Sequence, residues 1–125
     1  MRSRLQQLSR LRAALREALR DLERTLDCVF ERTPLLKGNV CELARKCGKP
    51  SCACTRGKLH RTMVLSWSEE GKTRLIAIPA ERLEGVRGKS DRYLQFRRAR
   101  AEVTKLHRQI LKWVDGIEKL RREKP

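Results

Sequence analysis

Apolar residues recur every three or four positions near both ends of the chain, which is the pattern of amphipathic helices. Residues 1 to about 31 contain neither Gly nor Pro and are rich in strong helix formers. Pro34 is expected to end this helix at Thr33, because proline restricts the residue before it to extended backbone. An apolar stripe with heptad spacing, interrupted once by Arg12, comprises Leu5, Leu8, Leu15, Leu19, Leu22, Leu26 and Val29.

The C-terminal segment has the same periodicity without an interruption. Gly88 is expected to end the segment before it, and Ser90 to cap a helix that begins there. Two long helices at opposite ends of the chain predict an antiparallel helical hairpin or coiled coil, but another copy or another protein's helices would bury the same stripes. The second stripe comprises Phe96, Ala99, Val103, Leu106, Ile110, Trp113, Ile117 and Leu120.

Between the helices the pattern changes to short apolar runs rich in β-branched residues. The runs RTMVLSWS (61–68) and TRLIAIP (73–79) predict two strands, and Gly71 in the connection between them indicates a β-hairpin. The stretch PAERLEGV that follows is expected to form one or two helical turns. The predicted fold is therefore mainly α, with coiled-coil helices at 1–32 and 90–125 flanking a small β-hairpin head at 33–89.

A two-stranded hairpin alone is marginal in water, so the head needs another source of stability. Cys47, Cys52 and Cys54 lie directly before the first predicted strand, and His60 follows them. Thiolate sulfur and imidazole nitrogen are the usual ligands of structural zinc, which takes four of them in a tetrahedron. The sequence predicts a Zn²⁺ site, with Cys41 as the alternative to His60. Free thiols and redox chemistry stay open, because the spacing differs from that of common zinc fingers.

The net charge of +16, from 31 Lys and Arg against 15 Asp and Glu, points to a polyanionic partner. DNA is the expected partner, and RNA is less favoured because its single strands are read largely by aromatic stacking and this chain has few aromatic residues. Positive charge is densest in the head and recurs on the C-terminal helix. The candidate nucleic-acid-binding residues are Arg45, Lys46, Lys49, Arg56, Lys58, Arg61, Lys72, Arg74, Arg97, Arg98 and Arg100.

Neither an enzyme nor a membrane protein is indicated. The sequence has no paired carboxylates, no nucleophile with an evident base and no phosphate-cradling glycine loop. It also has no run of 18 apolar residues and no secretory signal, so a cytoplasmic location is expected.

The stretch CGKPSCACTRGKLH (47–60), followed by GKTRLIAIP (71–79), resembles a family of small, uncharacterised bacterial proteins known as a domain of unknown function. Members are often encoded beside transposases or recombinases in mobile elements. The resemblance covers about residues 45–115 and favours His60 over Cys41 as the fourth ligand, since Cys41 is outside the shared pattern. This chain departs from the family after His60, where Arg61, Thr62 and Met63 replace the usual Gly-Pro-Tyr.

Together these features predict a non-enzymatic, zinc-containing DNA-binding accessory protein of a mobile element, acting in transposition or recombination. The basic head would contact the phosphate backbone, and the helices would serve assembly, including a homo-oligomer through the helices. The alternatives are a coiled-coil adaptor that docks on a recombinase or transposase without itself holding DNA, and an RNA-binding protein.

Overall fold

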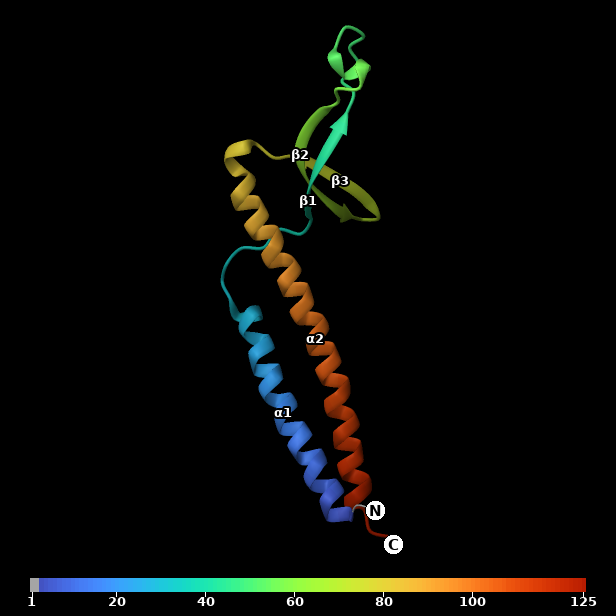
Figure 1. Cartoon of the computed structure of the whole chain (residues 1–125). Helices are drawn as coiled ribbons and strands as arrows, with labels where there is room; N and C mark the ends of the chain where they lie inside the picture. The colour runs from blue at the N-terminus through green and yellow to red at the C-terminus, as the bar shows by residue number, and fades with distance from the viewer. Residues whose placement is uncertain (1–2) are drawn as a thin grey trace. The chain divides into compact units, whose positions relative to one another are not determined.

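The computed structural model describes residues 3–125, which form two compact units (Figure 1). One unit consists of the chain up to Arg32 together with Gln95–Pro125, and the other consists of Thr33–Leu94. The fold is mainly helical with a small antiparallel sheet, as the sequence predicts. No helix in this described part of the chain has the length and apolarity needed to cross a bilayer.

Helix α1 (Arg4–Phe30) begins at a capping box. The Ser3 hydroxyl accepts a hydrogen bond from the backbone N–H of Gln6 at 3.1 Å, and the Gln6 side chain accepts one from the Ser3 N–H at 3.0 Å. Two N–H groups that no helical carbonyl can reach are thereby satisfied. The helix ends three residues before Thr33, in agreement with the predicted stop.

The predicted apolar stripe of α1 is partly wrong. Leu5 and Leu19 are 77% and 49% exposed, whereas Leu11 is half-buried and Ala18 is only 2% exposed. The buried stripe differs from the predicted one because the heptad spacing continues through Leu11 and Ala18. Arg12 therefore lies outside the buried stripe, in solvent. Its members include Leu8, Leu11, Leu15, Ala18, Leu22 and Val29.

Helix α2 (Leu83–Arg121) confirms the second stripe, since all eight predicted residues are buried or half-buried. The predicted start is wrong. The helix follows the short 3₁₀ helix η2 (Ala80–Arg82) and runs through Gly85 and Gly88, so Ser90 lies inside it rather than capping it. Glycine costs only about 1 kcal/mol in a helix, which the contacts made by this first part of α2 offset.

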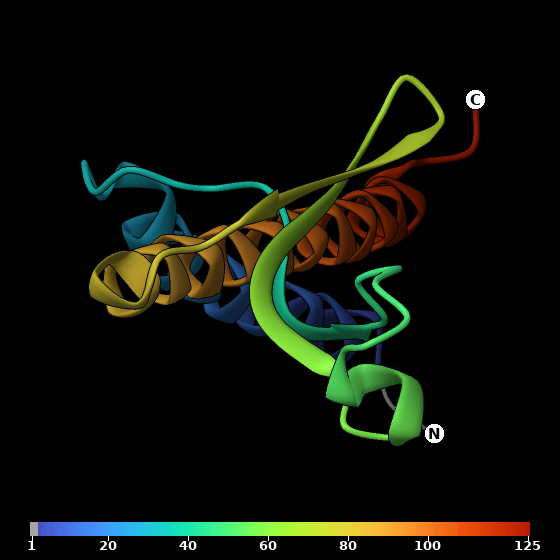
Figure 2. The same cartoon turned by 90° about the horizontal axis from the view of Figure 1, so that it is seen from above.

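Within the helical unit, α1 lies alongside the C-terminal part of α2, as the views in Figures 1 and 2 agree. A Cβ atom added to Gly116 would lie 3.1 Å from a methyl group of Leu11. Gln7 of α1 and Leu120 of α2 line one hollow, so the first turns of α1 lie beside the last turns of α2.

The sheet has three strands in the order β1-β2-β3, one more than the predicted hairpin. They are β1 (Asn39–Arg45), β2 (His60–Glu69) and β3 (Lys72–Ala77), and each neighbouring pair is antiparallel. Strands β2 and β3 correspond to the two predicted runs. The turn between them is two residues long, Glu70 and Gly71, and both have positive φ as a type I′ hairpin requires.

The core of the sheet unit is small. Val64 and Leu65 on β2 are buried on opposite faces of the sheet, and Ile78 beyond β3 is also buried. The first part of α2 is tied to the segment before β1 by two hydrogen bonds, Leu36 N–H to the Lys89 carbonyl and the Ser90 hydroxyl to the Gly38 carbonyl. These bonds hold α2 at Lys89 and Ser90, where the sequence predicts its start.

Candidate metal centre

The four predicted ligands surround the connection between β1 and β2. Cys47 follows the end of β1 by two residues, and His60 is the first residue of β2. Arg45 and His60 form the last pair of the β1–β2 ladder, so the sheet holds the two ends of the connection together. We call residues 46–59 the metal loop, which lies at the opposite end of β2 from the β2–β3 turn (Figure 2).

Tight turns fold the metal loop back on itself. Gly48 has φ +88°, and the Cys52 N–H donates to the Lys49 carbonyl at 3.1 Å across a turn that contains Pro50. The 3₁₀ helix η1 (Ala53–Arg56) follows and carries Cys54. Gly57, at φ +96°, ends it. Glycine is favoured at both positive-φ positions, and proline suits the second position of a turn.

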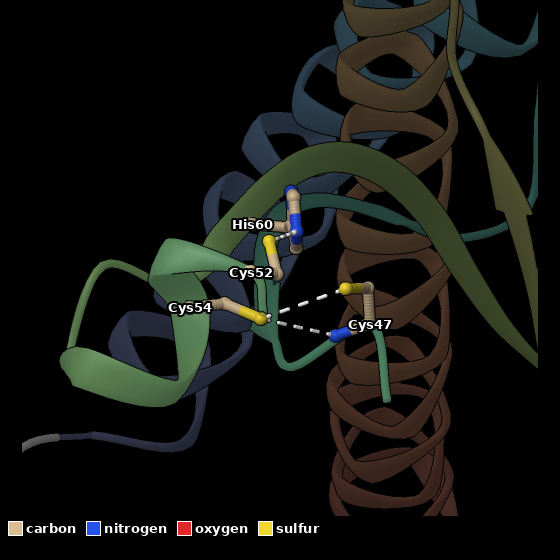
Figure 3. Close-up of side chains that lie close together, drawn as sticks. All are labelled: Cys47, Cys52, Cys54 and His60. Carbon is tan, nitrogen blue, oxygen red and sulfur yellow. Dashed lines mark hydrogen bonds between the residues drawn. The ribbon is translucent and has the colours of Figure 1, made fainter. Parts of the chain in front are cut away.

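The loop brings the side chains of Cys47, Cys52, Cys54 and His60 together, with all four ligand atoms within 4.8 Å of one another (Figure 3). The Sγ atoms of Cys47 and Cys54 are 3.6 Å apart, and Cys52 Sγ lies 3.1 Å from His60 Nε2. The backbone N–H of Cys47 also points at Cys54 Sγ, at 3.4 Å. The cluster thus consists of two close pairs facing each other.

These distances fit a tetrahedral metal ion. Zinc–sulfur bonds of about 2.3 Å at the tetrahedral angle place two sulfurs about 3.7 Å apart, close to the Cys47–Cys54 separation. The Cys52–His60 pair would have to open by a few tenths of an ångström, since a sulfur and a nitrogen on zinc lie about 3.5 Å apart. Three thiols and one imidazole are a donor set that zinc takes in structural sites. The four residues therefore lie close enough to hold a metal ion and are compatible with zinc.

The cluster is buried on one side only. Cys54 is fully buried and Cys52 half-buried, while Cys47 and His60 are exposed. Cys54 fixes the inner corner of the site, and an ion can enter from the solvent side.

The pKa values of the Cys52 and Cys54 thiols are shifted in opposite directions. Hydrogen bonds from the Cys54 backbone N–H, the Cys54 thiol and His60 lower the pKa of Cys52 to about 6. The Cys47 N–H lowers the pKa of Cys54, but burial and the neighbouring thiols outweigh it, so the pKa of Cys54 is raised above its ordinary value. Since metals bind thiolates, Cys52 is ready to bind at neutral pH and Cys54 must first lose a proton.

Cys41, the alternative ligand, does not lie in the cluster. It is exposed on β1, opposite Val64 of β2. Thr55 is a supporting residue that sequence reasoning missed. Its hydroxyl donates to the Cys52 carbonyl at 2.8 Å, which holds the first turn of η1. The signal was a Thr three residues after a cysteine, the spacing at which a hydroxyl bonds back to a backbone carbonyl.

The eleven candidate nucleic-acid-binding residues are all exposed, but their surroundings differ. Arg61 pairs with Glu42 at 3.2 Å, and Arg74 lies 3.9 Å from Glu69. No acidic residue occurs between positions 43 and 68. Five cations of this stretch have no ion pair among the described residues: Arg45, Lys46, Lys49, Arg56 and Lys58.

The remaining candidates do not belong to the metal loop. Lys72 follows the β2–β3 turn, and Arg97, Arg98 and Arg100 lie on α2 in the helical unit, pointing in different directions around the helix. Trp67 is half-buried on β2, and its indole N–H donates to the Glu69 carboxylate at 3.3 Å.

Comparison with protein families gives a match that covers most of the chain. The model of a domain of unknown function, DUF6788, matches residues 4–88, which include α1, the metal loop, the sheet and the start of α2. Comparisons with curated proteins and with solved structures found no significant match. With helix α1 and the Cys₃His cluster both inside the matched region, the chain belongs to the DUF6788 family.

Proposed function

We propose that the protein is a non-enzymatic DNA-binding accessory protein whose metal loop, folded around Zn²⁺, contacts the phosphate backbone. The observation that carries the proposal is a set of five cations without an ion pair among the described residues, four on the metal loop and Arg45 at the adjoining end of β1, in a stretch without acidic residues that contains the Cys₃His cluster. Lys and Arg gathered on one surface are the electrostatic footprint of phosphate binding.

Zinc would serve structure and charge in this function. Three thiolates and a neutral imidazole on Zn²⁺ carry a net charge of about −1. The four cations of the metal loop and the adjoining Arg45 exceed that charge, so this surface stays strongly positive when zinc is bound. The closed four-ligand set leaves no open position for a substrate, which favours a structural role over a catalytic one.

The contacts proposed here position the protein on the duplex without reading its sequence. Lysine and arginine bind phosphate oxygens, and the loop offers no long helix that would enter the major groove. Arg61 and Arg74 contribute less than the five unpaired cations, because Glu42 and Glu69 already neutralise them in part.

The helical unit would serve assembly. We propose that α1 and the C-terminal part of α2 form an antiparallel helical hairpin, which the approach of Leu11 to Gly116 supports. The sequence resemblance to proteins encoded beside transposases and recombinases favours a role in a mobile genetic element, with such an enzyme as the protein partner.

The test is the salt dependence of duplex DNA binding by the zinc-loaded protein, measured by fluorescence anisotropy. If about five phosphates are neutralised, the logarithm of the affinity falls with the logarithm of salt concentration with a slope of about −4.5. In the double variant Lys49→Ala/Lys58→Ala the slope becomes shallower by about 1.8, since each lost contact removes about 0.9.

The matched control is Lys105→Ala/Lys112→Ala, which removes two exposed cations from α2 in the helical unit. It lowers the net charge equally, so an equal effect of both double variants would reject the metal loop as the binding surface. Affinity that does not respond to salt would reject phosphate binding altogether.

A further inference from the structure

Helix α1 carries a second stripe beside its buried one. Starting from Leu5, residues at alternating steps of four and three all lie on one side of the helix. All are exposed except Leu26, which is half-buried. The two ends of the stripe are the most exposed large apolar side chains described, Leu5 at 77% and Phe30 at 71%. The stripe consists of Leu5, Ser9, Arg12, Arg16, Leu19, Glu23, Leu26 and Phe30.

The stripe can pair with the same stripe of a second, antiparallel chain. Two copies of α1 laid antiparallel, with a two-fold axis between positions 17 and 18, bring each member opposite another member. Leu5 meets Phe30 of the second copy, and Arg12 meets Glu23 of that copy. Near the axis, the aliphatic stem of Arg16 lies against Leu19 of the second copy.

The charges also fit this arrangement. Arg12 and Glu23 have no ion pair within the described part of their own chain, whereas the neighbouring Arg24 pairs with Asp21. A parallel pairing would place Arg12 beside Arg12 and Glu23 beside Glu23, which like charges disfavour. The antiparallel pairing replaces both repulsions with two Arg12–Glu23 ion pairs.

We propose that the exposed stripe of α1 is a homodimer interface, in which two chains pair antiparallel through this helix. The partner is a second copy of this chain because a two-fold interface needs a surface complementary to itself, with each residue contacting the residue that contacts it in return. Two apolar contacts at the ends and two ion pairs between them meet that condition. The proposal goes beyond the proposed function and does not depend on DNA or metal binding.

The test is sedimentation equilibrium of the full zinc-loaded chain, without DNA. The wild-type protein is expected at twice the 14.6 kDa mass of one chain. Arg12→Glu or Glu23→Arg alone places like charges opposite each other at two symmetric sites and raises the dissociation constant about tenfold. The double variant Arg12→Glu/Glu23→Arg restores opposite charges and returns the dissociation constant close to that of the wild type.

Glu17→Arg is the control, because it makes the same charge change as Glu23→Arg on the far side of α1, and it leaves the dissociation constant unchanged. Helical circular dichroism of each variant separates lost dimerisation from lost folding. A monomeric wild type, or a double variant no tighter than the single ones, overturns the proposal. So does a dimer that Leu111→Asp on α2 dissociates while Arg12→Glu does not.

Discussion

The hydroxyl of Ser90 on α2 donates to the carbonyl of Gly38, 52 positions earlier, at 2.6 Å. Ser90 is 3% exposed, so this bond is shielded from water. Gly38 has no room for a side chain, because an added Cβ would lie 2.7 Å from the Ser66 carbonyl oxygen. The pair joins the first part of α2 to the segment that leads into β1.

Ser90→Ala is expected to destabilise the protein by about 1–2 kcal/mol, because it leaves the Gly38 carbonyl without this donor. Gly38→Ala should cost more, since backbone atoms must move to admit the methyl group. Urea unfolding followed by the fluorescence of the two tryptophans, Trp67 and Trp113, measures both. Ser68→Ala, at an exposed position on β2, is the control and should change stability by less than about 0.5 kcal/mol. Equal effects of Ser90→Ala and Ser68→Ala would contradict the role of the buried bond.

Gly85→Ala should stabilise the protein by about 0.8 kcal/mol, because Gly85 is helical and nothing lies within 4 Å of an added Cβ. Gly71→Ala should do the opposite by about 1 kcal/mol, since Gly71 has φ +76° in the β2–β3 turn. Thermal melts of the two variants compare a glycine that costs stability with one that the turn requires. A loss of stability in Gly85→Ala would mean that α2 begins later than Leu83.

Cys54→Ser and His60→Ala should each abolish binding of one zinc ion per chain and unfold the metal loop. A structural zinc site contributes on the order of 10 kcal/mol, whereas the helical unit contains none of its ligands. Metal analysis should therefore show that each variant has lost its zinc, whereas circular dichroism should show that most of the helical signal is kept. Cys41→Ser is the matched control, because Cys41 lies outside the cluster. If it also loses the metal, the ligand assignment is wrong.

Zinc affinity should weaken as the pH falls, and more steeply below about pH 6. Above that pH Cys52 is already a thiolate, because hydrogen bonds hold its pKa at about 6, so its protonation does not oppose binding. Below it, one more proton must leave before the metal binds. The raised pKa of Cys54 means that a proton is also released near neutral pH. Competition titrations between pH 5 and 8 measure both slopes, and a constant slope would contradict the value for Cys52.

The Cys₃His cluster could be predicted from sequence because its four side chains lie within 14 residues, so that turns at Gly48 and Pro50 bring them together. Strand β1 could not, because only Val40 and Leu43 on it are half-buried and its partner strand lies beyond the metal loop. The start of α2 was missed for a similar reason. The Ser90 hydroxyl, which the sequence predicts to cap a helix, instead bonds to a segment about 50 residues away, and no local periodicity records such a contact.

The stripe of α1 illustrates a different difficulty. Leu8, Leu15 and Leu22 belong to the buried stripe, and Leu5 and Leu19 to the exposed one, yet heptad spacing alone joins them into a single series. Only the burial of Leu11 and Ala18 separates the two. β2 and β3 were predictable because a two-residue turn pairs adjacent segments.

The metal loop occupies the place of a hairpin turn, between the paired residues Arg45 and His60. A connection of this length closes slowly and loosely by itself, because many chain conformations must be given up before the first cross-strand contact forms. An ion that binds both Cys47 and His60 would bring the ends of the connection together early. The β1–β2 pairs could then form in order, from Arg45–His60 to Asn39–Ser66. Metal supply during synthesis would thus set when the sheet forms, because the sheet would nucleate at the ion, whereas the helical unit contains none of the ligands and would not wait for it.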